Sequence, residues 1–227
     1  ERNSPNQERL YIKDKMVKLI TLLRHGEVDA RDDIFRGSAE HELTKKGWQS
    51  MRKSMKEIQP PKKSSGRILS RKITRMKIDF LVTSPRIRCV RFAEQYKNDN
   101  QLPWKIDKEI AEMDFGDWEE QTFKKTKISD PKQYSLMYQN PERFHPPNGE
   151  KYLDFQKRTL SAFNRIKTLR INHVVIITHA GVISHLVSHL CGDPAKNWSK
   201  YYLPYGGYGQ IKKVSGKWKV TYIRPGN

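Results

Sequence analysis

The chain of 227 residues is long enough to bury one substantial core, and its length favours a single domain. Its 44 Lys and Arg residues against 25 Asp and Glu give a net charge of +19, which fits a nucleic acid, an anionic membrane or an acidic small substrate, and equally a basic surface without a partner. Cys89 and Cys191 lie far apart, which excludes a disulfide scaffold, and no apolar run is long enough to cross a membrane. We therefore expect a cytoplasmic protein.

Residues 1–15 are polar and contain no apolar segment of the kind that a signal peptide requires. We expect them to be a polar N-terminal extension, either natural or a remnant of cloning, that contributes nothing to a functional site. Residues 16–227 are then expected to form the one folded domain.

Short apolar runs alternate with amphipathic segments along this domain. The runs that predict strands lie at 17–24, 78–84, 104–110 and 173–179, and the third of them is weaker and expected at a sheet edge. Helices are predicted at 43–58 with Thr44 as N-cap, from Pro85 to residue 96, from about 151 to 170, and from 181 to a stop at Gly192, and a hairpin is predicted at 208–223 with its turn at Ser215-Gly216. This order predicts an α/β fold, a three-layer sandwich around a mostly parallel central sheet.

The stretch from 113 to 150 is rich in proline and aromatic residues, and we expect it to form a small irregular cap. Its aromatic side chains either line a pocket for a flat group or make the core of the cap, and we expect at least half of them in the core. They are Trp118, Phe123, Tyr134, Tyr138 and Phe144.

Residues 60–77 form a basic insertion with seven Lys and Arg residues and no acid. Leu69, Ile73 and Met76 would share one helical face, so we expect a surface loop and a short helix with a solvated basic side. Contact of this insertion with nucleic acid or with an anionic membrane is the alternative.

Three of the predicted strands end in residues suited to anions. The first ends at Arg24-His25-Gly26, the second at Thr83-Ser84-Pro85 with Arg88 in the next helix, and the strongest at Thr178-His179. The carboxyl ends of parallel strands meet at one edge of an open sheet, where helix N-termini also favour anions. Because an arginine fork binds two phosphoryl oxygens in one plane, the sequence predicts a phosphate site at this edge.

Four motifs occur in order along the chain: RHGE (24–27), SPRIR (84–88), EMDFGDWE (112–119) and THAG (178–181). Together they resemble the histidine phosphatase superfamily, also called the phosphoglycerate mutase-like family, over nearly the whole domain. The resemblance implies the phosphoglycerate mutase-like fold.

The resemblance also implies a role for each matching residue. His25 would be the nucleophile that becomes phosphohistidine, and Arg24 and Arg88 would clamp the phosphoryl oxygens. His179 would complete the pocket, and Glu112 would protonate the leaving oxygen. These residue types suit the chemistry, since a neutral imidazole is a competent nucleophile and fixed cations stabilise the transferring phosphoryl group.

Some positions depart from the family pattern. Members often carry asparagine six residues after the histidine, where this chain has Arg31, and we expect Arg31 to add a substrate-binding cation. Gly37 lies in a segment similar to the family's glycine loop, and we expect it to bind substrate. Arg86 stands where members usually carry an apolar residue. His185 and His189 have the i, i+4 spacing of a zinc pair, but no glutamate follows His185, so we expect ordinary helix histidines and no metal site.

The compact span between Glu112 and His179 and the strings FGDWE and PPNGE are more similar to the phosphatase branch, which includes α-ribazole phosphatase, than to the phosphoglycerate mutases. We therefore predict a phosphomonoester hydrolase that needs neither metal nor cofactor and acts on a small phosphorylated metabolite, for example one similar to α-ribazole phosphate. A phosphoglycerate mutase is the first alternative. A basic nucleic-acid or membrane-binding module on a phosphatase scaffold is the second.

Overall fold

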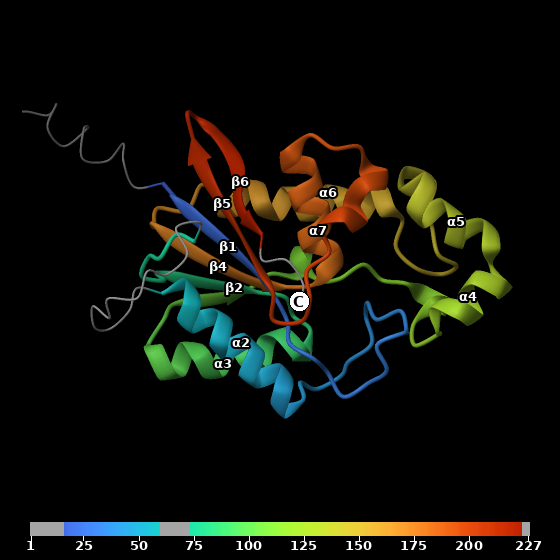
Figure 1. The fold of residues 1–227 in the computed structure, drawn as a ribbon, viewed down its shortest axis with the longest axis horizontal. Helices are drawn as coiled ribbons and strands as arrows, with labels where there is room; N and C mark the ends of the chain where they lie inside the picture. The colour runs from blue at the N-terminus through green and yellow to red at the C-terminus, as the bar shows by residue number, and fades with distance from the viewer. Residues whose placement is uncertain (1–15, 60–72, 224–227) are drawn as a thin grey trace, which may run out of the picture.

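A computed structural model describes residues 16–59 and 73–223, and its sheet has the strand order β3-β2-β4-β1-β5-β6 (Figure 1). The strands are β1 (Leu19–Arg24), β2 (Phe80–Thr83), β3 (Trp104–Ile106), β4 (His173–Thr178), β5 (Tyr208–Val214) and β6 (Lys217–Ile223). The first four pair in parallel, and β5 and β6 are antiparallel. The predicted mostly parallel sheet is therefore confirmed.

The central strand pair, β1 and β4, positions the two histidines of the RHGE and THAG motifs. Every residue of both strands is buried, and a parallel strand covered on both faces needs apolar residues throughout, as in LITLLR and HVVIIT. The register pairs Arg24 with Thr178, so the strands end side by side. His25 and His179 therefore leave the sheet as neighbours, and the His25 N–H donates to the Thr178 carbonyl at 2.9 Å.

Helices cover both faces of the sheet (Figure 1). α2 (Lys45–Ile58) and α3 (Ile87–Asn100) lie on one face, and α6 (Tyr152–Ile166) and α7 (Ala180–Cys191) lie on the other. The two faces carry separate clusters of buried apolar side chains. This arrangement confirms the predicted three-layer α/β sandwich.

Side-chain caps set the beginnings of α2 and α3. Thr44 caps α2 as predicted, since its hydroxyl accepts the Gly47 N–H at 3.0 Å. The prediction that α3 begins at Pro85 was wrong, because Arg86 is still extended and the helix begins at Ile87. The Glu40 carboxylate accepts the Ile87 N–H at 2.8 Å, a partner distant in sequence.

Other boundaries also differ from the sequence prediction. The strand predicted at 104–110 ends at Ile106, because Asp107 accepts the Glu109 N–H and starts a 3-10 turn, η1 (Lys108–Ile110). Helix α6 ends at Ile166, earlier than predicted. The hairpin turn at Ser215-Gly216 is confirmed, with φ of 49° and 78°, the left-handed backbone of a two-residue turn.

The cap at 113–150 is more regular than predicted. It contains α4 (Phe123–Ser129), α5 (Pro131–Gln139) and the 3-10 turns η2 (Gly116–Trp118) and η3 (Pro141–Arg143). Thr122 and Asp130 cap the two helices by accepting the N–H groups of Lys125 and Gln133. The helices are too short to show a clear apolar period, so their caps and the packing of the cap make them form. The cap lies beside the edge where β1 and β4 end (Figure 1).

Residues 1–15 and most of the basic insertion, 60–72, lie outside the described residues. The described end of the insertion, 73–77, forms no helix. Thr74 is instead tied to β5, where it exchanges two hydrogen bonds with the Gln210 side chain, at 2.8 and 2.9 Å. Within the described ranges no helix is long and apolar enough to span a bilayer.

Candidate active site

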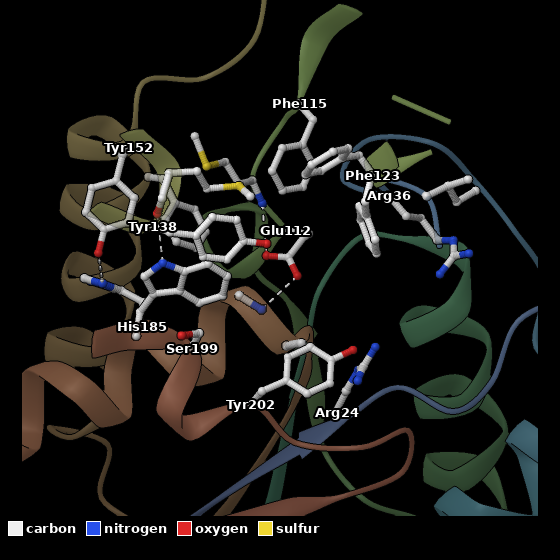
Figure 2. Close-up of a pocket in the computed structure, with 18 of the residues that line it drawn as sticks. Arg24, Arg36, Glu112, Phe115, Phe123, Tyr138, Tyr152, His185, Ser199 and Tyr202 are labelled. Atoms are coloured by element: carbon white, nitrogen blue, oxygen red, sulfur yellow. Dashed lines mark hydrogen bonds between the residues drawn. The ribbon is translucent and has the colours of Figure 1, made fainter. Parts of the chain in front are cut away.

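The predicted anion-binding residues come together at the edge where β1, β2 and β4 end. A pocket of about 410 Å³ opens there, lined by Arg24, His25 and Glu112 together with aromatic side chains that include Phe123, Tyr138 and Tyr152 (Figure 2). His179 lies behind His25, with the two ring centroids 5.3 Å apart. Arg88 is near enough for its charge to lower the pKa of both histidines.

His25 is buried, with 4% of its surface exposed, and it is held in one tautomer. Its Nδ1 lies 2.8 Å from the Gly26 carbonyl oxygen. Because a carbonyl oxygen only accepts, Nδ1 carries the proton and Nε2 keeps its lone pair. Burial lowers the pKa of His25 well below its usual value, and the charges of Arg88 and Arg24 lower it further. A neutral imidazole with a free Nε2 is the state that a nucleophile needs.

Arg24 is the last residue of β1 and is fixed from several sides. Its Nη1 donates to the Leu203 carbonyl at 2.6 Å. The guanidinium lies 4.1 Å from the ring centre of Tyr205 and 4.7 Å from that of Tyr202, and such aromatic faces attract a cation (Figure 2). These contacts hold the cation next to His25.

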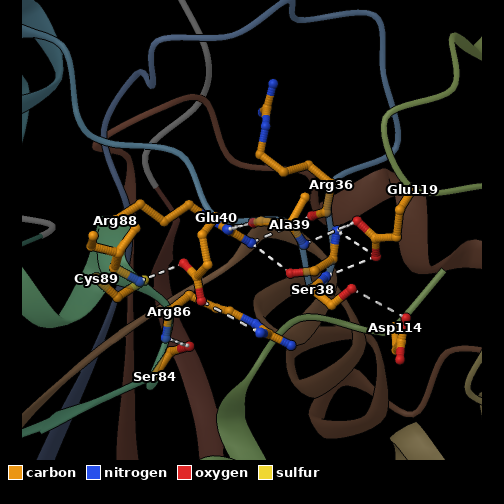
Figure 3. Close-up of polar contacts among 12 residues, drawn as sticks. Arg36, Ser38, Ala39, Glu40, Ser84, Arg86, Arg88, Cys89, Asp114 and Glu119 are labelled. Carbon is orange, nitrogen blue, oxygen red and sulfur yellow. Dashed lines mark hydrogen bonds and ion pairs between the residues drawn. The ribbon is translucent and has the colours of Figure 1, made fainter. Parts of the chain in front are cut away.

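Arg88 lies in the first turn of α3 and is completely buried. Its Nη1 donates to the Ala39 carbonyl at 2.7 Å, and its Nη2 donates to the Gly37 carbonyl at 2.9 Å (Figure 3). Burial lowers the pKa of Arg88, but the usual value is so high that the guanidinium stays charged. Backbone carbonyls of the loop after Arg36 thus hold the Arg88 guanidinium in place.

Gly37 lies in this loop because nothing larger fits. A Cβ there would lie 1.8 Å from the Met113 carbonyl oxygen. The Gly37 N–H donates to the Glu119 carboxylate, which also accepts the N–H groups of Ser38 and Ala39 (Figure 3). Gly37 and Glu119 therefore fix the loop whose carbonyl groups bind Arg88. Gly37 is not among the residues that line the pocket, so its predicted contact with substrate stays a prediction.

His179 follows β4 and is held by Ser84, which follows β2. The Ser84 Oγ lies 2.6 Å from His179 Nε2 and also accepts the Arg86 N–H at 3.3 Å. A serine hydroxyl can donate to Nε2 as well as accept from it, and when it donates, the histidine proton lies on Nδ1. Burial and the charge of Arg88 lower the pKa of His179 well below its usual value. His179 is thus a neutral donor beside His25.

Glu112 is held at the pocket wall by two backbone groups. The Gly181 N–H, at the start of α7, donates to its Oε2 at 3.0 Å, and the Met113 N–H donates to its Oε1 at 3.2 Å (Figure 2). Burial raises the pKa of Glu112, and the hydrogen bond from Gly181 opposes that shift. A raised pKa favours the protonated form, which is what a proton donor requires.

Arg158 on α6 fixes the loop that carries Glu112. Its guanidinium donates to the carbonyls of Glu109, Ala111 and Glu112 at 2.8, 2.7 and 3.0 Å. It also pairs with the Glu150 carboxylate at 2.6 Å. No sequence motif pointed to Arg158, because the contacts that fix the loop are with three backbone carbonyls, which spacing does not reveal.

Arg36 is the cation that lines the pocket together with Arg24, whereas Arg31 lies outside the pocket lining, and its predicted contact with substrate stays a prediction. The Arg31 side chain is 71% exposed, pairs with Asp33 at 2.8 Å and does not line the pocket. Arg36 lines the pocket and donates to the Tyr205 hydroxyl at 3.1 Å. Its charge contributes to the lowered pKa of His25. The signal in the sequence was the position of Arg36 directly before Gly37.

Several buried donors of the site have no protein partner within the described residues. They are Nε of Arg24, Arg36 and Arg88, and Nδ1 of His179. An unpaired buried donor costs about 1–3 kcal/mol. A phosphate group offers the acceptors that these donors need.

The aromatic residues of the cap divide between core and pocket. Trp118 and Phe144 are buried, and Tyr134 packs against the same core cluster, so at least half of the five lie in the core as predicted. Phe123, Tyr138 and Phe144 line the pocket. The cap aromatics therefore serve both the core and the pocket wall, with Phe144 in both, and a flat group as the occupant stays a prediction.

The sequence predicts no metal site. Among the residues that the structure describes, no group of three or more His, Cys, Asp and Glu side chains is placed to hold a metal ion. Independence of metal stays a prediction.

A buried histidine flanked by arginines and a carboxyl, at the carboxyl edge of an α/β sheet, is typical of enzymes that handle phosphate esters. The chain belongs to branch 1 of the histidine phosphatase superfamily, since the model of that family matches residues 20–224. The family resemblance of the four motifs is therefore confirmed, and membership supports phosphatase activity.

The relatives of the chain include named phosphatases. An adenosylcobalamin/α-ribazole phosphatase of Escherichia coli K12 is 27% identical over 192 residues, 84% of this chain and 87% of that protein. The α-ribazole phosphatase of Shigella flexneri superposes with a TM-score of 0.70 at 24% identity, over 91% of this chain and 96% of that one. A mycobacterial glucosyl-3-phosphoglycerate phosphatase superposes with a TM-score of 0.72 at 18% identity, over 92% of this chain and 99% of that one. The two solved structures share the fold, and the predicted phosphoglycerate mutase-like architecture is confirmed.

Proposed function

We propose that the protein is a phosphomonoester hydrolase that works through a phosphohistidine on His25. The observation that carries this proposal is the state of His25, a buried neutral imidazole whose Nδ1 is bonded to Gly26 and whose Nε2 keeps its lone pair. Arg24 and Arg88 stand beside it as fixed cations. Phosphoryl transfer depends mainly on such positioning and charge.

In the first step Nε2 of His25 attacks phosphorus, and the bond from phosphorus to the ester oxygen breaks. The guanidinium groups of Arg24 and Arg88 and the Nδ1–H of His179 face the charge that collects on the phosphoryl oxygens. The leaving oxygen takes a proton from the Glu112 carboxyl, whose raised pKa keeps that proton available. The products are an alcohol and phosphohistidine.

In the second step water attacks phosphorus while the Glu112 carboxylate accepts a proton from the water. The bond between phosphorus and Nε2 breaks, which regenerates neutral His25 and releases inorganic phosphate. The second step is the reverse of the first with water in place of the alcohol, so the same carboxyl group serves as acid and then as base.

A direct test uses the variants His25→Ala and Glu112→Gln with a panel of phosphorylated metabolites and measures released phosphate with and without EDTA. Wild type should release phosphate in EDTA, and His25→Ala should be inactive. Glu112→Gln should accumulate an added phosphoryl mass on His25 at neutral or alkaline pH, because its second step lacks a base. Hydrolysis that survives in His25→Ala would overturn the proposal.

The substrate class proposed here is a small phosphorylated metabolite, and the names of the relatives suggest one similar to α-ribazole phosphate. The alternative of a phosphoglycerate mutase is tested by interconversion of 3- and 2-phosphoglycerate with 2,3-bisphosphoglycerate present. Mutase turnover that exceeds hydrolysis would replace the hydrolase. Nucleic-acid binding through the insertion is tested by RNA filter binding across salt concentrations, since a surface that tracks phosphates loses affinity steeply with salt.

A further inference from the structure

Arg24 and Arg36 are two cations that line one pocket (Figure 2). The charges of both add to the effect of burial in lowering the pKa of His25, so both lie close to the nucleophile. Like charges in a site with little water repel each other, and two guanidinium groups stay together there only where other groups hold them. Phosphoryl transfer also needs cations that are already in position, because these cost no reorganisation when charge develops. The contacts that fix the two arginines therefore bear on the reaction.

Tyr205 lies in the loop before β5 and lines the same pocket. The backbone of this loop is joined to the end of β1 on both sides of the tyrosine. The Gly206 N–H donates to the His25 carbonyl at 3.0 Å, and the Gly207 carbonyl accepts the Arg24 N–H at 2.9 Å. Tyr205 is thus held at a fixed place relative to the nucleophile.

The ring of Tyr205 holds Arg24. The guanidinium carbon of Arg24 lies 4.1 Å from the centre of this ring, and the ring centres of Tyr205 and His25 are 5.6 Å apart. An aromatic face attracts a cation, and the attraction is stronger where water is excluded than on an open surface. The ring therefore keeps the Arg24 guanidinium beside the nucleophile.

The hydroxyl of Tyr205 joins Arg36 to Asp32. Arg36 Nη1 donates to the hydroxyl oxygen at 3.1 Å, and the hydroxyl donates to Asp32 Oδ1 at 2.9 Å. A guanidinium only donates and a carboxylate only accepts, so the direction of both hydrogen bonds is fixed. Burial raises the pKa of Tyr205, the charge of Arg36 opposes this shift, and the bond to Asp32 adds to it, so the hydroxyl keeps its proton at neutral pH. Asp32 thus turns the hydroxyl so that its oxygen faces Arg36.

We propose that Tyr205 is a positioning residue of the phosphate site, whose ring holds Arg24 and whose hydroxyl, oriented by Asp32, holds Arg36, so that one side chain sets both cations around the phosphoryl group. This inference rests on the proposed hydrolase function, because it concerns the same site. Tyr205 acts through the two arginines and not on the reacting atoms. When the hydroxyl is removed, the Arg36 guanidinium should turn to the Asp32 carboxylate and away from the phosphoryl group.

The first test measures the Kd for inorganic phosphate by calorimetry, which needs no turnover. Tyr205→Phe keeps the ring and removes the hydroxyl, so the Kd should rise about 5-fold, the effect of one hydrogen bond. Tyr205→Leu also removes the ring, and the Kd should rise about 5-fold further because Arg24 loses its aromatic face. The matched control is Tyr201→Phe, which loses a bond of 2.6 Å from a tyrosine hydroxyl to Asp193, outside the pocket lining, and should keep the wild-type Kd.

A double-mutant cycle separates positioning of Arg36 from general support of the loop. Arg36→Gln alone should raise the Kd for phosphate about 10-fold. If the hydroxyl acts through Arg36, adding Tyr205→Phe to Arg36→Gln should change the Kd by less than about 2-fold. A tyrosine that only supports the loop would add its full effect in both backgrounds.

The dependence of kcat/KM on pH gives a second readout with p-nitrophenyl phosphate. The charges of Arg24 and Arg36 lower the pKa of His25, so a variant that lets either charge move away should shift the acid limb to higher pH. Tyr205→Phe and Arg36→Gln should therefore shift this limb upward by similar amounts, and Tyr205→Leu should shift it further. Tyr201→Phe should leave it in place.

The outcomes separate the two proposals. An unchanged Kd in Tyr205→Phe, or an equal rise in the presence and absence of Arg36, would refute the role of Tyr205 and leave the hydrolase standing. Wild-type protein that binds phosphate and hydrolyses no ester would refute the hydrolase, while the Kd cycle still decides whether Tyr205 sets Arg36. Tyr205→Phe keeps the shape of the side chain, so the cycle stands even if Tyr205→Leu folds poorly.

Discussion

Replacing Gly181 by alanine should displace the proton donor without harming the fold. The Gly181 N–H donates to Glu112 Oε2 at 3.0 Å, and a Cβ at this position would lie 2.3 Å from Oε1 and 3.0 Å from the carboxyl carbon. Carbon and oxygen do not approach so closely, so the end of the Glu112 side chain must move by roughly 1 Å. Alanine in a helix is favoured over glycine by about 1 kcal/mol, so stability should be kept or raised.

The expected loss of activity follows from the hydrogen bond that the displaced carboxyl gives up. Glu112 becomes a carboxylate as it gives up its proton in the transition state, and a hydrogen bond to a charged group contributes about 1.5–3 kcal/mol. Since each 1.36 kcal/mol is a factor of ten in rate, kcat/KM for an alkyl phosphate should fall by about 10- to 150-fold. An ester such as p-nitrophenyl phosphate needs little protonation, and its kcat/KM should fall by less than about 5-fold.

The assay measures kcat/KM for glycerol phosphate and p-nitrophenyl phosphate together with the thermal midpoint. Ser184→Ala is the matched control, since it lies on the same helix, its buried hydroxyl has no partner in the described structure, and it does not line the pocket. It should behave as wild type. An equal loss for both esters in Gly181→Ala, with an unchanged midpoint, would show that Glu112 is not the proton donor. Full activity toward the alkyl ester would show that Gly181 does not set its position.

Three other predictions follow from the site. His25 acts as nucleophile when it is neutral, above its lowered pKa, and Glu112 acts as donor when it is protonated, below its raised pKa. The plot of kcat/KM against pH should therefore be bell-shaped. Its acid limb should lie below the ordinary histidine pKa of 6.5, and its alkaline limb above the ordinary glutamate pKa of 4.5. Glu112→Gln should remove the alkaline limb, and a limb that stays belongs to another group. Arg36→Gln should weaken inhibition by inorganic phosphate about 10-fold, whereas Arg31→Gln should change it little, and the reverse order would identify Arg31 as the substrate-binding cation that the sequence predicts. Arg158→Met should lower the free energy of unfolding in urea by about 2 kcal/mol, because Glu150 and three carbonyls lose their donor, and it should also slow alkyl esters more than p-nitrophenyl phosphate.

The sequence determined by itself those features that depend on neighbours along the chain. Continuous apolar runs predicted β1 and β4, a threonine predicted the start of α2, and Ser215-Gly216 predicted the hairpin turn. The motifs at the strand ends also predicted which residues meet, because parallel strands bring their carboxyl ends to one edge whatever the helices between them do. For this reason the order of residues along the chain is enough to place Arg24, His25 and His179 together.

Only the tertiary structure decided the features that depend on the direction of a side chain or on a partner distant in sequence. Arg31 and Arg36 are both cations after the same strand, and their spacing does not say that Arg31 turns to Asp33 while Arg36 turns to Tyr205. Gly26 set the tautomer of His25, Ser84 held the ring of His179, and Arg158 reached backbone carbonyls on a loop more than forty residues away. Which way a side chain turns depends on its torsion angles and on its contacts with residues distant in sequence. The order of residue types along the chain gives neither of these.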